Sequence, residues 1–205
     1  MFTGIVAAIG KITAIHPAGP EAEAGVRLIV NAGALPLADV ILGDSIALNG
    51  ACMTVVAKTA DSMCFDVSRE SLNRTVGLDA LGEVNLEKAL TLADRLGGHL
   101  VSGHVDGIGL VEKFAAIGES WELIVAAPVE LGKYLAYKGS IVVNGVSLTV
   151  NQVIDRADAC AVSINLIPHT IEVTTLKHLY AGAHVNLEID LIARYVERML
   201  KRTAD

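Results

Sequence analysis

The segment SIALNGACMTV at residues 45–55 recurs as SIVVNGVSLTV at residues 140–150. Six of the eleven positions are identical, and most of the others exchange one apolar residue for another. The offset between the copies drifts from 99 to 95 to 101 along the chain, as surface loops of unequal length would cause. The chain is therefore predicted to be a tandem duplication joined near residues 90–99. Four further pairs of blocks recur in the same order: MFTGIVAAIG (1–10) and LVSGHVDGIG (100–109), VRLIV (26–30) and WELIV (121–125), VSRESLNRT (67–75) and VSINLIPHT (162–170), and VNLE at 84–87 and 185–188.

Each copy has the pattern of a β protein, with short β-branched segments separated by glycine and polar turn residues. Asn49-Gly50 and Asn144-Gly145 each separate two such segments, and Asn-Gly favours a two-residue hairpin because both residues tolerate a positive φ. Several short strands in roughly 90 residues predict a small closed barrel or a sandwich. Brief helical patterns occur at ALPLADVI (34–41), ALTLADRLG (89–97) and PVELGKYLA (128–136).

The last segment differs from the rest of the chain. Between Glu188 and Arg202 apolar residues recur every three or four positions, which predicts an amphipathic helix. Glu188 and Asp190 at its start, and Lys201 and Arg202 at its end, complement the helix dipole. Such a helix either covers the end of a barrel or packs against other protomers, and the pattern does not separate these alternatives.

The composition excludes several classes of protein. Hydrophobic residues make up 52% of the 205 positions and the net charge is only −7, which excludes a disordered chain. No apolar run approaches a membrane span and no basic-then-apolar leader is visible, so we expect no membrane association. With 16 Lys and Arg against 23 Asp and Glu, we expect no nucleic-acid partner. Cys52, Cys64 and Cys160 lack metal-site spacing and fit reduced thiols in a cytoplasm.

A first candidate site is the pattern Asn-Gly-x-[Cys/Ser]-x-Thr, which occurs once per copy. Positions two apart on a strand point to the same face, so Cys52 with Thr54, and Ser147 with Thr149, are each predicted to form a small polar patch. The alternative is a hairpin whose side chains bond only nearby backbone. The exchange of Cys for Ser between the copies favours two sites that are not equivalent.

A second candidate is GGHLVSGHVDG at residues 97–107. On a strand, His99 and His104 would point to opposite faces, so a metal site is not expected. A neutral histidine at a barrel mouth could instead act as a donor, an acceptor or a general base. The glycines do not lie in a strand–turn–helix unit, so the segment is not a dinucleotide-binding motif.

A third candidate is the pair SRESLNRT (68–75) and SINLIPHT (163–170), each ending in a threonine. Pro168 biases Ile167 toward an extended conformation that could frame a ligand, although a simple connecting turn is an equal alternative. Lys138 is typical of a solvated surface lysine. The remaining histidines, His16, His178 and His184, are interpreted as surface or structural residues.

Together these blocks closely resemble the riboflavin synthase family over essentially the whole chain. The most specific combination is MFTG at residue 1 with GGHLVSGHVDG and NGVSLTV, supported by NGACMTV, SRESLNRT, INLIPHT and VNLEID. The resemblance implies an all-β fold of two tandem six-stranded antiparallel Greek-key barrels with a C-terminal α-helix. It implies a lumazine-binding barrel at residues 1–97, a second at 98–187 and an oligomerisation helix at 188–205.

The same resemblance implies an activity and an assembly. Two molecules of 6,7-dimethyl-8-ribityllumazine would dismutate to riboflavin and 5-amino-6-ribitylamino-uracil, the last step of riboflavin biosynthesis, with no metal or redox cofactor. The C7 methyl protons of this substrate are acidic, so the protein chiefly has to orient two flat rings. Family members are homotrimers whose sites lie between the barrels of two protomers. We therefore expect a cytoplasmic homotrimer, with lumazine synthase as a further expected partner.

The competing hypothesis is a non-catalytic lumazine- or flavin-binding protein on the same double barrel, such as the lumazine proteins. Those proteins keep one working site and bind their ligand as monomers. Both Asn-Gly-x-[Cys/Ser]-x-Thr patches are intact in this chain and the C-terminal helix is present, which favours the enzyme.

Site residues follow from the resemblance by position. Ser147 and Thr149 are expected to bind one lumazine ring, His104 to assist proton transfer, and Cys52 to neighbour the second ring or act as a nucleophile. Ala51 stands where some relatives have a second cysteine. The N-terminal barrel's site would comprise Gly4, Ile5, Val6, Cys52, Met53, Thr54, Asp66, Val67, Ser68, Arg69, Glu70 and Ser71, with Phe2 and Thr3 reaching the ligand from the N-terminus. The C-terminal barrel's site would comprise Gly103, His104, Val105, Lys138, Ser147, Leu148, Thr149, Leu166, Ile167, Pro168, His169, Thr170 and Ile171.

Overall fold

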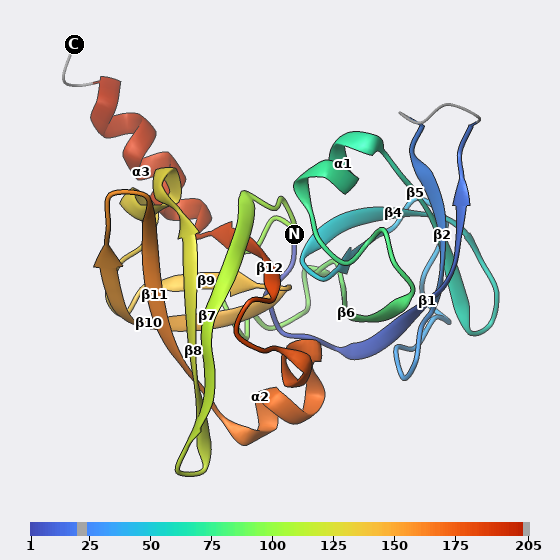
Figure 1. Ribbon diagram of the computed structural model, residues 1–205. Coiled ribbons are helices and arrows are strands. Elements are labelled where there is room, and N and C mark those ends of the chain that lie inside the picture. Colours follow the sequence, from blue (N-terminus) through green and yellow to red (C-terminus); the bar gives the residue numbers. More distant parts are fainter. Residues whose placement is uncertain (20–23, 203–205) are drawn as a thin grey trace.

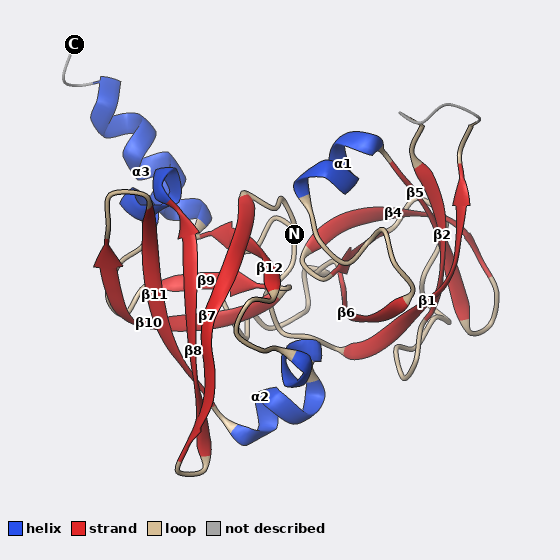
Figure 2. Ribbon diagram, in the orientation of Figure 1, coloured by secondary structure: helices blue, strands red, loops and turns tan. Residues whose placement is uncertain are grey.

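A computed structural model describes residues 1–19 and 24–202 as two closed six-stranded antiparallel barrels lying side by side (Figure 1). Strands form most of both units, and the helices lie at their periphery (Figure 2). The first barrel closes in the order β1-β2-β5-β4-β3-β6 and the second in the equivalent order β7-β8-β11-β10-β9-β12. The predicted duplication and the predicted all-β class are confirmed. The strands are β1 (Ala8–Pro17), β2 (Val26–Asn31), β3 (Ser45–Leu48), β4 (Ala51–Lys58), β5 (Ser62–Val67), β6 (Gly82–Lys88), β7 (Gly107–Ile117), β8 (Ser120–Pro128), β9 (Ser140–Val143), β10 (Val146–Asp155), β11 (Ala159–Leu166) and β12 (His184–Ile189).

Each barrel encloses its own apolar core, because alternate residues along its strands point inward. In β4, Ala51, Met53 and Val55 are buried, whereas Cys52 is half-buried and Thr54 is exposed. The equivalent strand β10 repeats this alternation, with Ser147 half-buried and Thr149 exposed. The two predicted polar patches therefore lie on the outer faces of their barrels.

The two Asn-Gly hairpins meet at the junction between the barrels. Asn49 and Gly50 have φ of 45° and 85°, and Asn144 and Gly145 have φ of 47° and 82°, as a tight hairpin turn requires. A Cβ atom on Gly50 would lie 2.8 Å from the backbone nitrogen of Gly145, and the reverse distance is the same. Only glycine therefore lets the two turns approach this closely.

The helices only partly match the sequence patterns. Residues 34–41 and 89–97 form turns and bends, and only the third pattern folds, as the 3-10 helix η1 (Val129–Tyr134). Leu35, Leu37 and Val40 are buried in the first barrel's core from an irregular loop, which explains their helix-like apolar spacing. The short helices α1 (Arg69–Arg74) and α2 (Pro168–Val173) follow β5 and β11, and η2 (Thr175–His178) follows α2.

The structure also corrects the repeat alignment after β4. Val55 pairs with Phe65 in the first barrel, but the equivalent Val150 pairs with Ile164 in the second, so the second hairpin is four residues longer. The counterpart of Thr75 is therefore Thr174, and not Thr170 as the sequence comparison indicated. The hydroxyls of Thr75 and Thr174 each donate to the carbonyl four residues earlier, both at 2.7 Å.

The C-terminal helix α3 (Leu191–Arg202) projects from the second barrel (Figure 1). It begins later than expected, because Glu188 belongs to β12 and is buried, whereas Asp190 accepts a hydrogen bond from the Ile192 backbone. The side of α3 that faces away from the barrel exposes large apolar side chains, including Ile192 and Met199. Residues 203–205 of the expected helix lie outside the described residues. Within the described ranges, every helix is too short or too polar to span a membrane.

Candidate active site

A short segment precedes each barrel, lies at the junction, and packs against the opposite barrel. Phe2 and Val101 pair through two backbone hydrogen bonds of 2.7 and 3.1 Å, with Phe2 fully buried. Val6 packs against the core of the second barrel, and its counterpart Val105 packs against the core of the first. The N-terminal segment (residues 1–6) therefore borders the second barrel, and the connecting segment (residues 101–105) borders the first.

Because each segment packs against the opposite barrel, the expected assignment of site residues to the two barrels is wrong for both segments. Gly4, Ile5 and Val6 were assigned to the N-terminal barrel's site, but the Ser147 backbone donates a 2.7 Å hydrogen bond to the Gly4 carbonyl. Gly103 and its neighbours were assigned to the C-terminal barrel's site, but the Cys52 backbone donates a 2.8 Å hydrogen bond to the Gly103 carbonyl. The cause is that each segment crosses the junction before its own barrel begins.

A cavity of about 190 Å³ lies beside Cys52 on the first barrel. Strand β4 supplies one wall, α1 and the residue after it supply another, and the connecting segment closes the third side. His104 is exposed at this cavity, so the structure places it with Cys52 and not with Ser147. The lining residues are Ala51, Cys52, Met53, Glu70, Ser71, Arg74, Thr75, Gly103, His104 and Val105.

On the second barrel, Ser147 is paired with a different histidine. The His99 Nδ1 atom lies 2.7 Å from the Ser147 Oγ atom, and the His99 backbone donates a 3.1 Å hydrogen bond to the Thr3 carbonyl. Burial lowers the pKa of His99, so its ring is neutral near pH 7. The Nε2 atom is buried without a hydrogen-bond partner among the described residues. Such a ring is suited to accept a proton through Ser147.

His99 belongs to the second candidate segment of the sequence, but its contact with Ser147 is not among the expected ones. The sequence predicts a strand around it, but residues 97–105 are irregular apart from the bridge at Val101. The signal that could have found His99 is the glycine before it. A Cβ atom on Gly98 would lie 2.1 Å from the Thr3 carbonyl oxygen and 2.8 Å from the Ser147 Cβ atom. Gly98 thus allows the close approach that brings His99 to Ser147.

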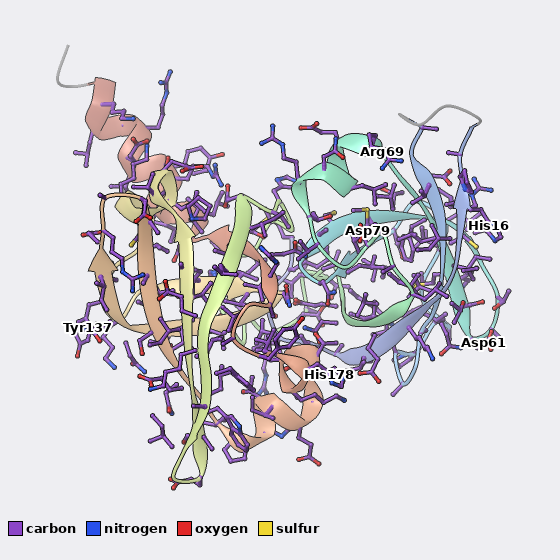
Figure 3. The ribbon with its side chains drawn as sticks, viewed as in Figure 1. His16, Asp61, Arg69, Asp79, Tyr137 and His178 are labelled. Carbon is purple, nitrogen blue, oxygen red and sulfur yellow. The ribbon has the colours of Figure 1, made fainter. Side chains whose placement is uncertain are left out.

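Several other predicted site residues have contacts within the fold. Asp66 forms a two-bond ion pair with Arg27, Ser68 caps α1, and Arg69 donates to the Ala24 carbonyl. Arg69 lies at α1 on the first barrel (Figure 3).

Three further predicted site residues are buried in the barrel cores. They are Val67 in the first barrel, and Leu148 and Leu166 in the second.

Lys138 lies next to Tyr137, which is on the side of the second barrel away from the first (Figure 3). Its ammonium group donates a 2.9 Å hydrogen bond to the Asn151 side chain. Its φ is +62°, at a position where the first copy has Gly43. The structure does not join Lys138 to the His99–Ser147 pair.

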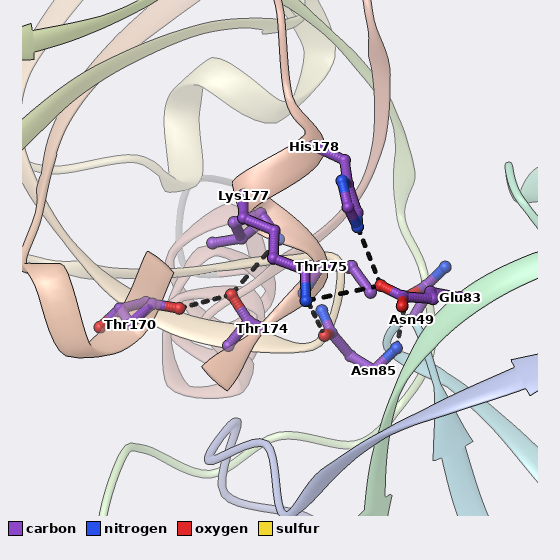
Figure 4. Close-up of polar contacts among 9 residues, drawn as sticks. Asn49, Glu83, Asn85, Thr170, Thr174, Thr175, Lys177 and His178 are labelled. Carbon is purple, nitrogen blue, oxygen red and sulfur yellow. Dashed lines mark hydrogen bonds and ion pairs between the residues drawn. The ribbon is translucent and has the colours of Figure 1, made fainter. Parts of the chain in front are cut away.

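The α2 region contacts the first barrel. Asn85 on β6 accepts a 2.8 Å hydrogen bond from the Thr175 backbone, and its own backbone donates to the Asn49 side chain (Figure 4). The His178 Nε2 atom lies 2.8 Å from a Glu83 carboxylate oxygen, and His178 is exposed, in agreement with its interpretation as a surface residue (Figure 4).

The predicted site residues of the α2 region differ in their exposure. The exposed ones are Ile167, Pro168 and His169, and the half-buried ones are Thr170 and Ile171.

Two closed barrels in tandem, each with a polar patch and a histidine at its outer face, define a duplicated small-molecule-binding protein. The family model for the lumazine binding domain matches residues 3–89 and 102–190, once for each barrel. The chain is 45% identical to riboflavin synthase of Photobacterium phosphoreum, over 98% of this chain and 89% of that protein. It is 42% identical to riboflavin synthase of Mycobacterium bovis, over 98% of both chains.

Solved structures show the same architecture. LumP complexed with 6,7-dimethyl-8-(1'-D-ribityl) lumazine superposes with a TM-score of 0.76 at 25% identity, over 92% of this chain and 99% of that one. LumP complexed with riboflavin gives the same TM-score at 26% identity. The chain belongs to the riboflavin synthase family.

Proposed function

We propose that this protein is an enzyme that transfers a four-carbon unit between two molecules of 6,7-dimethyl-8-ribityllumazine, giving riboflavin and 5-amino-6-ribitylamino-uracil. The observation that carries the proposal is the presence of two polar sites that differ in their residues. Cys52 lies with His104 at one barrel, and Ser147 lies with His99 at the other. A reaction between two identical molecules needs one donor and one acceptor, and two unlike sites can treat the molecules differently.

The chemistry required of each site is modest. The C7 methyl group of the lumazine is acidic, so a neutral base is sufficient to remove its proton. The His99–Ser147 pair can supply that base, with Thr149 offering a further hydroxyl on the same outer face. At the other ring, Cys52 and His104 are the candidate nucleophile and proton carrier. Holding the two rings in contact would supply the rest of the acceleration.

The test is to incubate the purified protein with the lumazine without any added cofactor. We expect riboflavin to form, as measured by its absorbance and fluorescence. Tight binding without turnover would instead support a non-catalytic lumazine- or flavin-binding protein. The identity of 42–45% to riboflavin synthases, against 25–26% to LumP, favours the enzyme.

The proposal includes an assembly. The cavity beside Cys52, at about 190 Å³, is smaller than the roughly 300–1,000 Å³ of typical ligand pockets, so a second wall from another protomer would complete it. The exposed apolar side chains of α3 support self-association. We therefore propose a homotrimer with sites between protomers, located in the cytoplasm. Association with lumazine synthase rests on the family resemblance alone.

A further inference from the structure

Two buried glutamates occupy equivalent places in the two barrels. Glu87 on β6 is 7% exposed and accepts hydrogen bonds from the Thr3 backbone, the Thr3 hydroxyl and the Gly4 backbone at 2.6, 2.7 and 3.0 Å. Glu188 on β12 is 3% exposed and accepts from the Ser102 backbone, the Ser102 hydroxyl and the Gly103 backbone at 2.7, 2.7 and 3.0 Å. The same three-bond arrangement is therefore built twice.

Each arrangement leads directly to the polar site of the opposite barrel. Glu87 belongs to the first barrel, but the Gly4 carbonyl accepts the backbone hydrogen bond of Ser147 on the second. Glu188 belongs to the second barrel, but the Gly103 carbonyl accepts the backbone hydrogen bond of Cys52 on the first. A single glycine therefore links each carboxylate to a site residue of the opposite barrel. Gly4 links Glu87 to Ser147, and Gly103 links Glu188 to Cys52.

These connections have little room to move. Gly4 and Gly103 have φ of 75° and 77°, which few other residues adopt. A Cβ atom on Gly4 would lie 2.6 Å from the Ser147 Cβ atom, and one on Gly103 would lie 2.8 Å from the Cys52 Cβ atom. A displaced segment would therefore displace the site residue, or lose its hydrogen bond.

A carboxylate is a costly group to bury, and burial raises the pKa of both Glu87 and Glu188 despite their hydrogen bonds. The charge strengthens bonds from three donors at once, which fixes the position of a segment more firmly than a neutral acceptor would. Burying each carboxylate destabilises the folded state, and its three hydrogen bonds fix the position of one segment in return.

We propose that Glu87 and Glu188 are positioning residues that act crosswise, each holding the segment that shapes the ligand site of the opposite barrel. This inference rests on the proposed function for its consequences in catalysis. The positioning itself can be tested without any ligand.

The first test is amide hydrogen exchange followed by NMR. In Glu87→Gln, we expect the amides of Gly4 and Ser147 to exchange about tenfold faster or more, with Cys52 and Gly103 unchanged. Glu188→Gln should show the reverse pattern. Glu119→Gln, on the exposed turn between β7 and β8, is the matched control and should change neither pair. Unchanged exchange in both variants, or equal acceleration at both sites, overturns the proposal.

The second test is titration with riboflavin. Ser147→Ala and Cys52→Ser identify which binding step belongs to which barrel. Glu87→Gln should weaken the step that Ser147→Ala weakens by about tenfold, and Glu188→Gln the step that Cys52→Ser weakens. A variant that weakens the step of its own barrel, or both steps equally, contradicts the crosswise role.

Two further points keep the tests decisive. If either glutamine variant does not fold, Thr3→Val and Ser102→Ala each remove one of the three donors to Glu87 or Glu188 and should give the same crosswise pattern with smaller changes. Thr3→Val also removes the oxygen that accepts a 3.1 Å hydrogen bond from the Ile5 backbone. If the wild-type protein binds no riboflavin, the proposed function fails, and the exchange experiment alone decides the positioning role.

Discussion

At the scale of single residues, the ionisation of His99 gives the sharpest test of the chemistry. Because burial lowers its pKa, the ring takes up a proton only below the ordinary value of about 6.5. We expect kcat/KM to fall on the acid side of that value. His99→Gln should remove this limb and lower kcat by about 10²–10⁴-fold. A pH–rate profile between about pH 5 and 8 measures both effects.

His104→Gln is the matched control, because it removes a histidine from the other barrel's site. It should lower the rate and leave the acid limb in place. An acid limb that persists in His99→Gln would contradict a role for the ionisation of His99. In that case the short contact between His99 and Ser147 would have no role in proton transfer.

At the scale of elements, the sequence predicted strands and hairpins better than helices or repeat offsets. The Asn-Gly turns were predictable because a positive φ at both residues is a local property. Residues 34–41 have a helix-like pattern although they form no helix, because Leu35, Leu37 and Val40 are buried against distant strands. The pairing of His99 with Ser147 is unpredictable for a related reason, since it joins segments that are 48 positions apart in the chain.

The helix α3 gives an element-scale prediction. A chain ending at Asp190 retains β12 and both barrels but lacks the exposed apolar side chains of the helix. We expect it to be monomeric in solution and to lose activity, because the cavity beside Cys52 then lacks a second wall. Light scattering after gel filtration and the riboflavin assay measure these two properties.

A full-length variant separates assembly from truncation. Ile192→Asp with Met199→Asp places charges on the exposed side of α3 and should also prevent assembly, whereas Arg198→Ala on the same helix should not. A monomeric variant with wild-type turnover would contradict a site shared between protomers.

At the scale of the whole molecule, the two barrels are related by an approximate two-fold axis. Residues close to this axis contact their own counterparts in the other barrel. Phe2 pairs with Val101, and Gly50 meets Gly145. The side chains of Asn85 and Asn186 donate to the carbonyls of Asn144 and Asn49 across the same junction. The barrels are thus joined by repeated polar contacts, and we expect them to unfold together.

Gly145→Ala tests this coupling, because its Cβ atom would lie 2.8 Å from the Gly50 backbone nitrogen at a φ of +82°. Gly43→Ala is the matched control, since Gly43 has a φ of +94° and no atom of the described residues lies within 4 Å of its Cβ position. The control should lose about 1–2 kcal/mol of unfolding free energy from backbone strain alone. Gly145→Ala should lose about 1–3 kcal/mol more, because the turns must separate. Denaturant unfolding measures the difference, and the separated barrels should then unfold in two transitions. Equal losses in both variants, with one transition each, would show that the barrels are not held together at these turns.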